Sequence, residues 1–200
     1  KSNSFCTLLA KMAPKSKAYY DRQKAKDKKK KQKEMAVIQA EHDAAGDTEL
    51  ARAMELSAVD AELTKLGLSM KDVPADGNCM FAAVSQQLQL IEAGDHDADA
   101  LRALAGQFIA DHKTDFAPFI AEAESDVDEY VRSLVSSAEK WGGDVELQAL
   151  ASALQIQIRV VKAQTPFPMF GEKGPMITLV HLEHFMVLGA HYAGTLPKPR

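Results

Sequence analysis

Cysteine is nearly absent from this sequence, which contains only Cys6 and Cys79 among its 200 residues. Two thiols form one disulfide at most, so the chain cannot be one of the small domains held together by several disulfides. No C-x-x-C pair occurs, which argues against a structural zinc site. We therefore expect no metal and a reducing location, cytoplasmic or nuclear.

Long apolar runs are also missing. No stretch approaches the roughly 18 apolar residues that a membrane-spanning helix needs. Residues 5–10, FCTLLA, are apolar but too short for the core of a signal peptide. The sequence therefore predicts no membrane partner. It begins with Lys rather than Met, as a fragment of a longer protein would.

Charge is divided unevenly along the chain. Residues 1–35 hold twelve Lys or Arg and three Asp or Glu, a net of +9, whereas residues 36–200 have a net of −13. The run KAKDKKKKQK at 24–33 offers no apolar face to a core. We expect residues 1–47 to be a basic arm, disordered or a solvated helix. It is either a simple tether or the functional part of the chain, making a nonspecific, salt-sensitive contact with a polyanion such as RNA or the ribosome.

The remaining residues, 48–200, are expected to form one folded domain that begins with a helix. Apolar residues recur there at three- and four-residue steps, which predicts five helices: around Leu56–Leu66, Met80–Ile91, Leu101–Ile109, Val127–Val135 and Leu147–Leu154. Alternating or β-branched runs predict strands at 156–161, 176–182 and 185–189, the last two as an antiparallel pair. This order indicates an α+β fold, a small mixed β-sheet flanked by helices.

The stretch VPADGNCMFAAV, residues 73–84, places Cys79 where a turn becomes a helix. Free N–H groups and the positive end of the helix dipole would favour the thiolate there. Asp76 is placed to cap the turn, and N–H groups gathered at such a turn can form an oxyanion hole. Cys79 is thus a candidate nucleophile, and the alternative is a small buried core residue.

A thiol nucleophile needs a base, which makes the histidines decisive. His181 and His184 flank a predicted strand turn and lack the further ligands of a metal site. His191 follows FMVLGA at a predicted strand exit, where a rigid element can aim its ring into a cleft. The order Cys, then a distant His, is that of papain-like hydrolases. Three other histidines are interpreted as surface residues: His42, His96 and His112.

Three segments resemble the ovarian-tumour (OTU) family of cysteine proteases, which are deubiquitinases. VPADGNCMFAAV resembles its D-G-x-C box, WGGDVELQALA at 141–151 its W-G-x-x-x-E-L-x-A-L-S segment, and GAHY at 189–192 its terminal G-x-H-Y. Their order and spacing agree across about residues 65–195. DFAPF at 115–119 and the lysine-rich arm resemble the subgroup-six OTU proteins.

The resemblance implies an OTU-type papain-like cysteine protease fold and a thiol-dependent deubiquitinase that hydrolyses isopeptide bonds at the C-terminal glycine of ubiquitin. It implies no cofactor and, as partners, ubiquitin and ubiquitinated proteins; we expect a monomer. Cys79 matches the nucleophile, His191 the general base, and Asp76 the aspartate of the box.

Other positions receive roles from the same resemblance. The loop of Asp76, with Gly77 and Asn78, would shape the oxyanion hole. The segment containing Trp141 and Gly142 is interpreted as mainly structural, with a border of the ubiquitin-tail channel as the alternative.

One position departs from the family pattern. OTU proteins usually read H-Y-N or H-Y-D, but this chain reads H-Y-A, with Ala193 where the side chain that orients the histidine should be. Such an orienting group holds the imidazole tautomer and ring angle. Either a pocket Asp, a backbone carbonyl or a water takes over this role, or the chain is an OTU-fold ubiquitin-binding or scaffold protein with weak or no turnover.

Overall fold

A computed structural model describes residues 26, 29–31, 33, 46, 48–120, 126–137, 140–186 and 189–199. The chain divides into two units, Lys1–Glu49 and Leu50–Arg200. Most of the first unit, including Cys6 and His42, lies outside the described residues, so the basic arm stays a prediction. None of the helices in the described part is both long and apolar enough to cross a bilayer.

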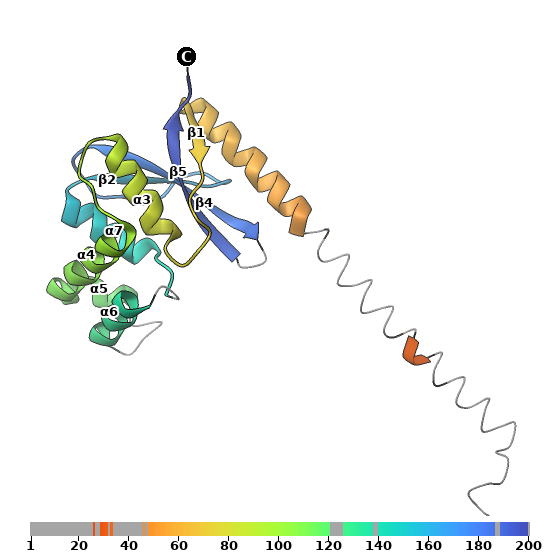
Figure 1. The fold of residues 1–200 in the computed structure, drawn as a ribbon, viewed down its shortest axis with the longest axis horizontal. Coiled ribbons are helices and arrows are strands. Elements are labelled where there is room, and N and C mark those ends of the chain that lie inside the picture. The colour runs from red at the N-terminus through yellow and green to blue at the C-terminus, as the bar shows by residue number, and fades with distance from the viewer. Residues whose placement is uncertain are drawn as a thin grey trace, which may run out of the picture. The chain divides into compact units, whose positions relative to one another are not determined.

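The strands form one mixed sheet of five, shown in Figure 1. The parallel pair is β2 and β4, and the other neighbours are antiparallel. Across the sheet the order is β1 (Leu68–Lys71), β5 (Gly189–Pro197), β4 (Met176–Met186), β2 (Gln157–Val161) and β3 (Met169–Phe170). The predicted α+β class with a small mixed sheet is confirmed.

All five predicted helices are present. They are the helix over 48–65, α3 (Cys79–Leu90), α4 (Ala98–Asp111), α6 (Val127–Ser136) and α7 (Asp144–Leu154). A short helix, α5 (Lys113–Ile120), was not predicted, because it spans only eight residues and contains Pro118. Helix α3 packs on β5 and β4, and α4 packs on α3, α6 and α7 (Figure 1).

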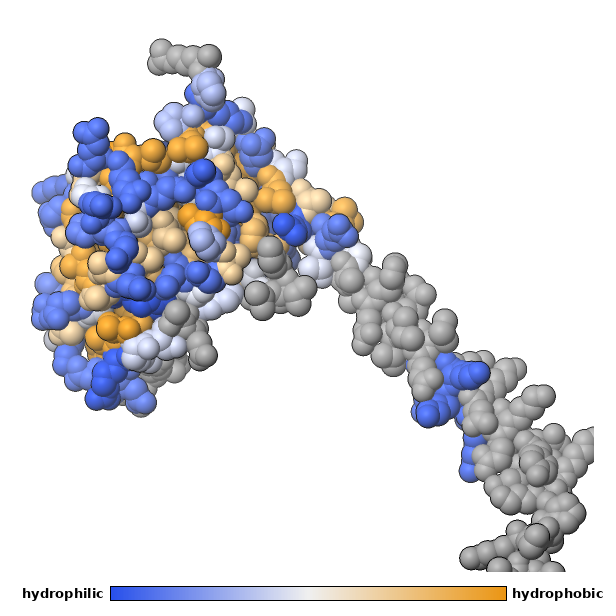
Figure 2. All heavy atoms as spheres, viewed as in Figure 1, coloured by the Kyte–Doolittle hydropathy of each residue, from blue (hydrophilic) through white to orange (hydrophobic). Residues whose placement is uncertain are grey.

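Two apolar clusters hold the sheet between helices. Along β4, Ile177 and Leu179 join the larger cluster with α3, α4 and α7, whereas Val180 and Leu182 join a smaller one with Val59 of the helix over 48–65. Successive strand side chains point to opposite faces, so that helix covers the face opposite to α3. On the face drawn in Figure 2, hydrophilic side chains predominate and apolar ones gather only in small patches.

The predicted pairing of residues 176–182 with 185–189 is wrong. Strand β4 continues to Met186, and its antiparallel partner is β5, so His191 lies within a strand rather than at a strand exit. The polar pair Glu183 and His184 suggested a turn. In the structure the pairing between β4 and β5 is irregular there, and Glu55 binds the two backbone N–H groups instead.

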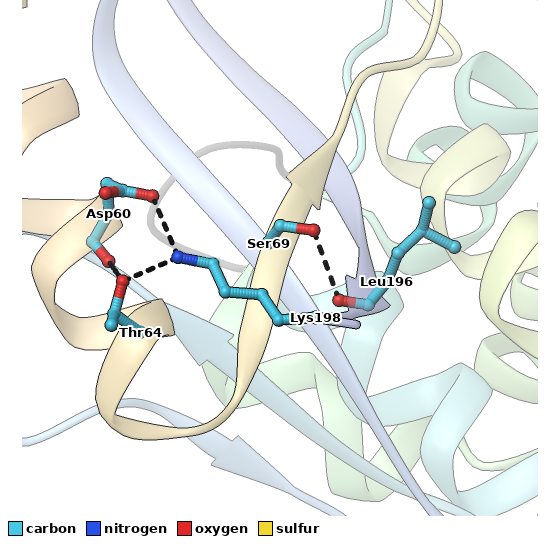
Figure 3. Close-up of polar contacts among 5 residues, drawn as sticks. All are labelled: Asp60, Thr64, Ser69, Leu196 and Lys198. Carbon is cyan, nitrogen blue, oxygen red and sulfur yellow. Dashed lines mark hydrogen bonds and ion pairs between the residues drawn. The ribbon is translucent and has the colours of Figure 1, made fainter. Parts of the chain in front are cut away.

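Hydrogen bonds and an ion pair join the end of the helix over 48–65 to the chain at the end of β5 (Figure 3). Gly67, at φ +72°, turns the chain into β1, and its carbonyl accepts a hydrogen bond of 2.8 Å from the N–H of Lys198. The Lys198 ammonium donates to Thr64 Oγ1 at 2.7 Å and lies 3.7 Å from Asp60. Ser69 of β1 donates to the carbonyl of Leu196 in β5 at 3.4 Å.

Candidate active site

The turn before α3 is stabilised by Asp76. Its carboxylate accepts a hydrogen bond of 2.8 Å from the N–H of Asn78, and its carbonyl accepts one of 3.2 Å from the N–H of Cys79. Helix α3 therefore begins at Cys79, as the turn residues predicted. The thiol sits at the helix N-terminus, where it is buried.

Arg102 of α4 supports this turn through hydrogen bonds. The sequence did not predict this role. Arg102 is 4% exposed, and its guanidinium donates to the Gly77 carbonyl at 2.7 Å and twice to Asn78 Oδ1, at 2.7 and 3.0 Å. Its remaining hydrogen bonds go to three carbonyls, those of Leu134, Ser137 and Lys140. A buried Arg among Leu101, Ala105 and Ile109 is the signal that could have pointed to it.

Cys79 and His191 line one cavity of about 160 Å³. Asp76, Gly77 and Trp141 lie in its wall with them, whereas Asn78 and Gly142 do not. The other lining residues are Ala75, Phe185, Gly189 and Ala190. The structure thus brings together residues from three segments that are far apart in the sequence.

His191 is oriented by Asp72, a residue that the sequence analysis did not single out. The imidazole is 3% exposed, and its Nε2 lies 3.0 Å from Asp72 Oδ1. A carboxylate only accepts hydrogen bonds, so Nε2 carries a proton, and in the neutral ring Nδ1 keeps a lone pair. This arrangement has the parts of a catalytic triad: a thiol, an imidazole in the same cavity, and a carboxylate behind the imidazole.

The model of the OTU-like cysteine protease family matches residues 74–192, more than half of the chain. The chain belongs to this OTU family. Among its relatives are the OTU domain-containing protein 6A of Mus musculus (34% identical, over 87% of this chain and 60% of that protein) and "Deubiquitinase OTUD6B" of Homo sapiens (30%, over 84% and 61%). The solved OTU domain of OTUD1 covers 74% of this chain, and the chain covers 97% of it, with a TM-score of 0.57 and 23% identity; this likeness shows the OTU fold. The chain spans about half the length of the curated relatives it matches, 47% to 60% of the first three.

The H-Y-A departure of this OTU protein has a structural counterpart in β1. Ala193 is fully buried in the small apolar cluster with Val59 and Leu63, and its methyl side chain offers no hydrogen-bonding group to His191. Lys71 pairs with Gly194 in the sheet, so the chain that continues to Asp72 runs beside Ala193. The carboxylate therefore reaches His191 from the neighbouring strand rather than from two residues downstream.

Burial is the largest influence on the pKa of Cys79 in this OTU domain. Burial raises the pKa of the Cys79 thiol above its ordinary value. Backbone hydrogen bonds involving Tyr192, Met80 and Cys79 itself oppose the rise in pKa, and the charge of Asp76 adds to it. This direction is opposite to the expected shift toward thiolate, and it favours the protonated thiol in the free protein.

The W-G-G segment of the OTU family borders the site. Trp141 is 46% exposed and lines the cavity, whereas Gly142 lies where an added Cβ would overlap the Met80 side chain. The N–H of Gly143 donates at 2.8 Å to Glu146, whose buried carboxylate also accepts from the Tyr130 hydroxyl. Burial raises the pKa of Glu146. The glycines therefore allow close packing and the start of α7.

The other histidines of the domain stand apart from the cavity. His181 and His184 both lie in β4, and burial, with the charge of Lys162, lowers the pKa of His181. His184 Nδ1 lies 3.4 Å from Glu55. In the part of the chain that the structure describes, no three His, Cys, Asp or Glu side chains are grouped as a metal site would require.

Proposed function

We propose that this chain is a thiol-dependent deubiquitinase, which hydrolyses isopeptide bonds at the C-terminal glycine of ubiquitin. The observation that carries the proposal is the shared cavity of Cys79 and His191, with Asp72 bound to His191 Nε2. Relatives named "Deubiquitinase OTUD6B" and "Ubiquitin thioesterase otu2" support the choice of substrate.

The first chemical step follows from the neutral thiol. Nδ1 of His191 takes the proton of Cys79 as the sulfur attacks the glycine carbonyl, and the imidazolium that forms is stabilised by Asp72. The carbonyl oxygen becomes an oxyanion in the tetrahedral intermediate. When the C–N bond breaks, His191 returns the proton to the departing lysine amine, which leaves ubiquitin bound to Cys79 as a thioester.

The second step is hydrolysis of the thioester. His191 takes a proton from water as the water oxygen attacks the carbonyl. The C–S bond then breaks, and His191 gives this proton to the departing sulfur, so ubiquitin leaves with a free C-terminal carboxyl group and Cys79 is again a thiol. No cofactor enters either step.

We assign an oxyanion donor to the N–H group of Gly77, since the N–H of Cys79 already donates to the Asp76 carbonyl at 3.2 Å. The N–H of Asn78 already donates to Asp76 at 2.8 Å, and the Asn78 side chain accepts from Arg102. Gly77 lines the cavity, and its N–H makes no hydrogen bond to any residue that the structure describes. Asp76 then acts by shaping this loop rather than by touching the substrate.

A ubiquitin-binding protein without turnover is the alternative that Ala193 suggested. The hydrogen bond from His191 to Asp72 favours an enzyme, because it supplies the orienting group that Ala193 cannot. The basic arm and its contact with polyanions form a separate proposal, tested by salt-dependent RNA binding of the chain with and without residues 1–45.

The deciding experiment uses ubiquitin with a thiol-reactive group at its C-terminus, together with a turnover assay. We expect one covalent adduct, mapped to Cys79 by peptide analysis, and none with Cys79→Ala. His191→Ala should reduce turnover by about 10²–10⁴-fold while the protein stays folded. Labelling of Cys6 in the Cys79→Ala protein, or binding of ubiquitin with no turnover by wild type, would reject the proposal.

A further inference from the structure

The irregular part of β4 is bound by a buried carboxylate from the helix over 48–65. Pairing with β5 shifts between Leu182 and Met186, which frees backbone N–H groups from the sheet ladder. The N–H of Glu183 donates to Glu55 Oε1 at 2.6 Å, and the N–H of His184 donates to Glu55 Oε2 at 2.9 Å. The carboxylate thus satisfies two donors that the sheet leaves without a partner.

The carboxylate in this contact is buried, and the contact is geometrically specific. Glu55 is 8% exposed, although glutamate is almost never buried without partners. Both carboxylate oxygens are used, one for each consecutive N–H, which sets the path of the backbone just before Phe185. Hydrogen bonds to a charged acceptor are about twice as strong as neutral ones, so this pair resists distortion of the strand.

Phe185 transmits this position to the catalytic base. Its ring stacks on the imidazole of His191, with centroids 4.1 Å apart and planes 19° apart. Arg52, one turn before Glu55 on the same helix, places its guanidinium carbon 5.2 Å from the centroid of the Phe185 ring. One turn of the helix therefore contacts both the backbone before Phe185 and the aromatic ring itself.

The helix has its own attachment to the sheet. Val59 and Leu63 are buried in the small apolar cluster with Val180 and Leu182. A continuous chain of contacts therefore runs from the buried face of this helix through Glu55, the backbone of β4 and Phe185 to His191.

We propose that Glu55 is a positioning residue for His191, which acts from the helix over 48–65 through the backbone of β4 and the Phe185 ring. Asp72 binds one ring nitrogen and so sets the tautomer, whereas Glu55, through Phe185, sets the plane in which the imidazole lies. The two supports act on different degrees of freedom of the same ring. This inference rests on the proposed function for its kinetic test but not for its spectroscopic one.

The test compares Glu55→Gln with Glu62→Gln, the same change at a surface position of the same helix, where Glu62 pairs with Lys65. Gln keeps the size of the side chain but turns an NH₂ group toward one of the two N–H donors. We expect Glu55→Gln to lower kcat on a fluorogenic ubiquitin substrate by about 10- to 100-fold, with KM within about twofold, because misplacement of a reacting group by about 1 Å costs up to 10²-fold. Glu62→Gln should leave both constants at the wild-type values.

NMR of the imidazole and Phe185 ring signals gives the readout that needs no ubiquitin. We expect Glu55→Gln to shift or broaden the His191 signals while the signals of the α3–α7 core stay unchanged. Phe185→Leu, which keeps an apolar side chain but removes the stack, should move the same signals and lower kcat even if Glu55→Gln fails to fold.

The outcomes separate this inference from the proposed function. Unchanged His191 signals in both folded variants would overturn it, as would a fall in kcat without any change in those signals. If wild type fails to turn over ubiquitin but Glu55→Gln still displaces the His191 ring, the positioning role stands and the proposed substrate is wrong.

Discussion

Arg102 and Asp72 support the two sides of the cavity, and they differ most in their exposure to water. Arg102 lies under the Cys79 turn and makes six hydrogen bonds from a buried guanidinium. The Asp72 side chain is 61% exposed, and its Oδ1 accepts hydrogen bonds only from His191 Nε2 and from the N–H of Val73, among the residues that the structure describes. The loop of the nucleophile is therefore part of the core, whereas the orientation of the base depends on a surface group. Loss of the first should affect folding, and loss of the second only the rate.

The largest effect in this comparison is expected from Arg102→Leu. The change removes the six hydrogen bonds that the guanidinium makes to four carbonyls and to Asn78 Oδ1, and a buried acceptor left without a donor costs about 1–3 kcal/mol. We expect the free energy of unfolding in urea to fall by about 3 kcal/mol or more, and labelling by the ubiquitin probe to be lost. Arg159→Leu is the control, since Arg159 makes a single 3.4 Å bond to Thr178 and should matter far less. Equal effects of the two changes would contradict the role of Arg102.

Asp72→Ala tests the other side. A hydrogen bond to a charged partner contributes roughly 1.5–3 kcal/mol, but solvent screening of an exposed carboxylate favours the lower end. We expect kcat to fall about 10-fold with KM unchanged, and the free energy of unfolding to change by less than about 1 kcal/mol.

NMR of the ring nitrogens sharpens the same test, because loss of Asp72 should release the Nε2–H tautomer of His191. Asp76→Ala serves as the contrast, since it removes a cap of the turn and not a partner of the ring. A wild-type rate in Asp72→Ala would mean that another group orients the imidazole.

Ala193→Asn restores the residue that OTU relatives carry, and the sequence alone predicts a faster enzyme. The structure predicts the opposite, because position 193 is fully buried among apolar side chains and Asp72 already binds His191 Nε2. We expect no gain in kcat/KM and a loss of about 1–3 kcal/mol in the free energy of unfolding. Ala193→Ser separates the contribution of polarity from that of size. A clear rise in kcat/KM with Ala193→Asn would show that Asp72 is an incomplete substitute.

The smallest effect concerns the resting state of the thiol. Because burial raises the pKa of Cys79, the folded protein keeps its thiol proton at pH values where the unfolded chain has begun to lose it. In a Cys6→Ser background, the rate of alkylation by iodoacetamide should therefore rise with pH at a higher midpoint in the folded protein than in urea. A rate that is already at its plateau at pH 7 would instead indicate a preformed thiolate.

Local patterns predicted most of the helices and the pair Cys79 and His191, because apolar spacing and short motifs of neighbouring residues identify both. The DGNC turn indicates where α3 begins, and GAHY identifies His191. Asp72 could not be predicted, since it is 119 positions from His191 and the strand before it, β1, has only four residues without clear alternation. The roles of Arg102 and Glu55 could not be predicted for the same reason, because their partners are backbone groups that tertiary packing brings near.

The β1–β5 register has a consequence for which changes of length the domain tolerates. Leu68 pairs with Pro197 and Lys71 with Gly194, and Asp72 follows directly. Because strand side chains alternate between faces, one residue added or removed between Gly67 and Asp72 would turn the carboxylate away from His191, yet leave the backbone ladder able to form. Insertions there should yield proteins that fold but do not turn over the ubiquitin substrate. The four positions of β1, Leu68–Lys71, therefore fix the distance from the Gly67 turn to the carboxylate that orients His191.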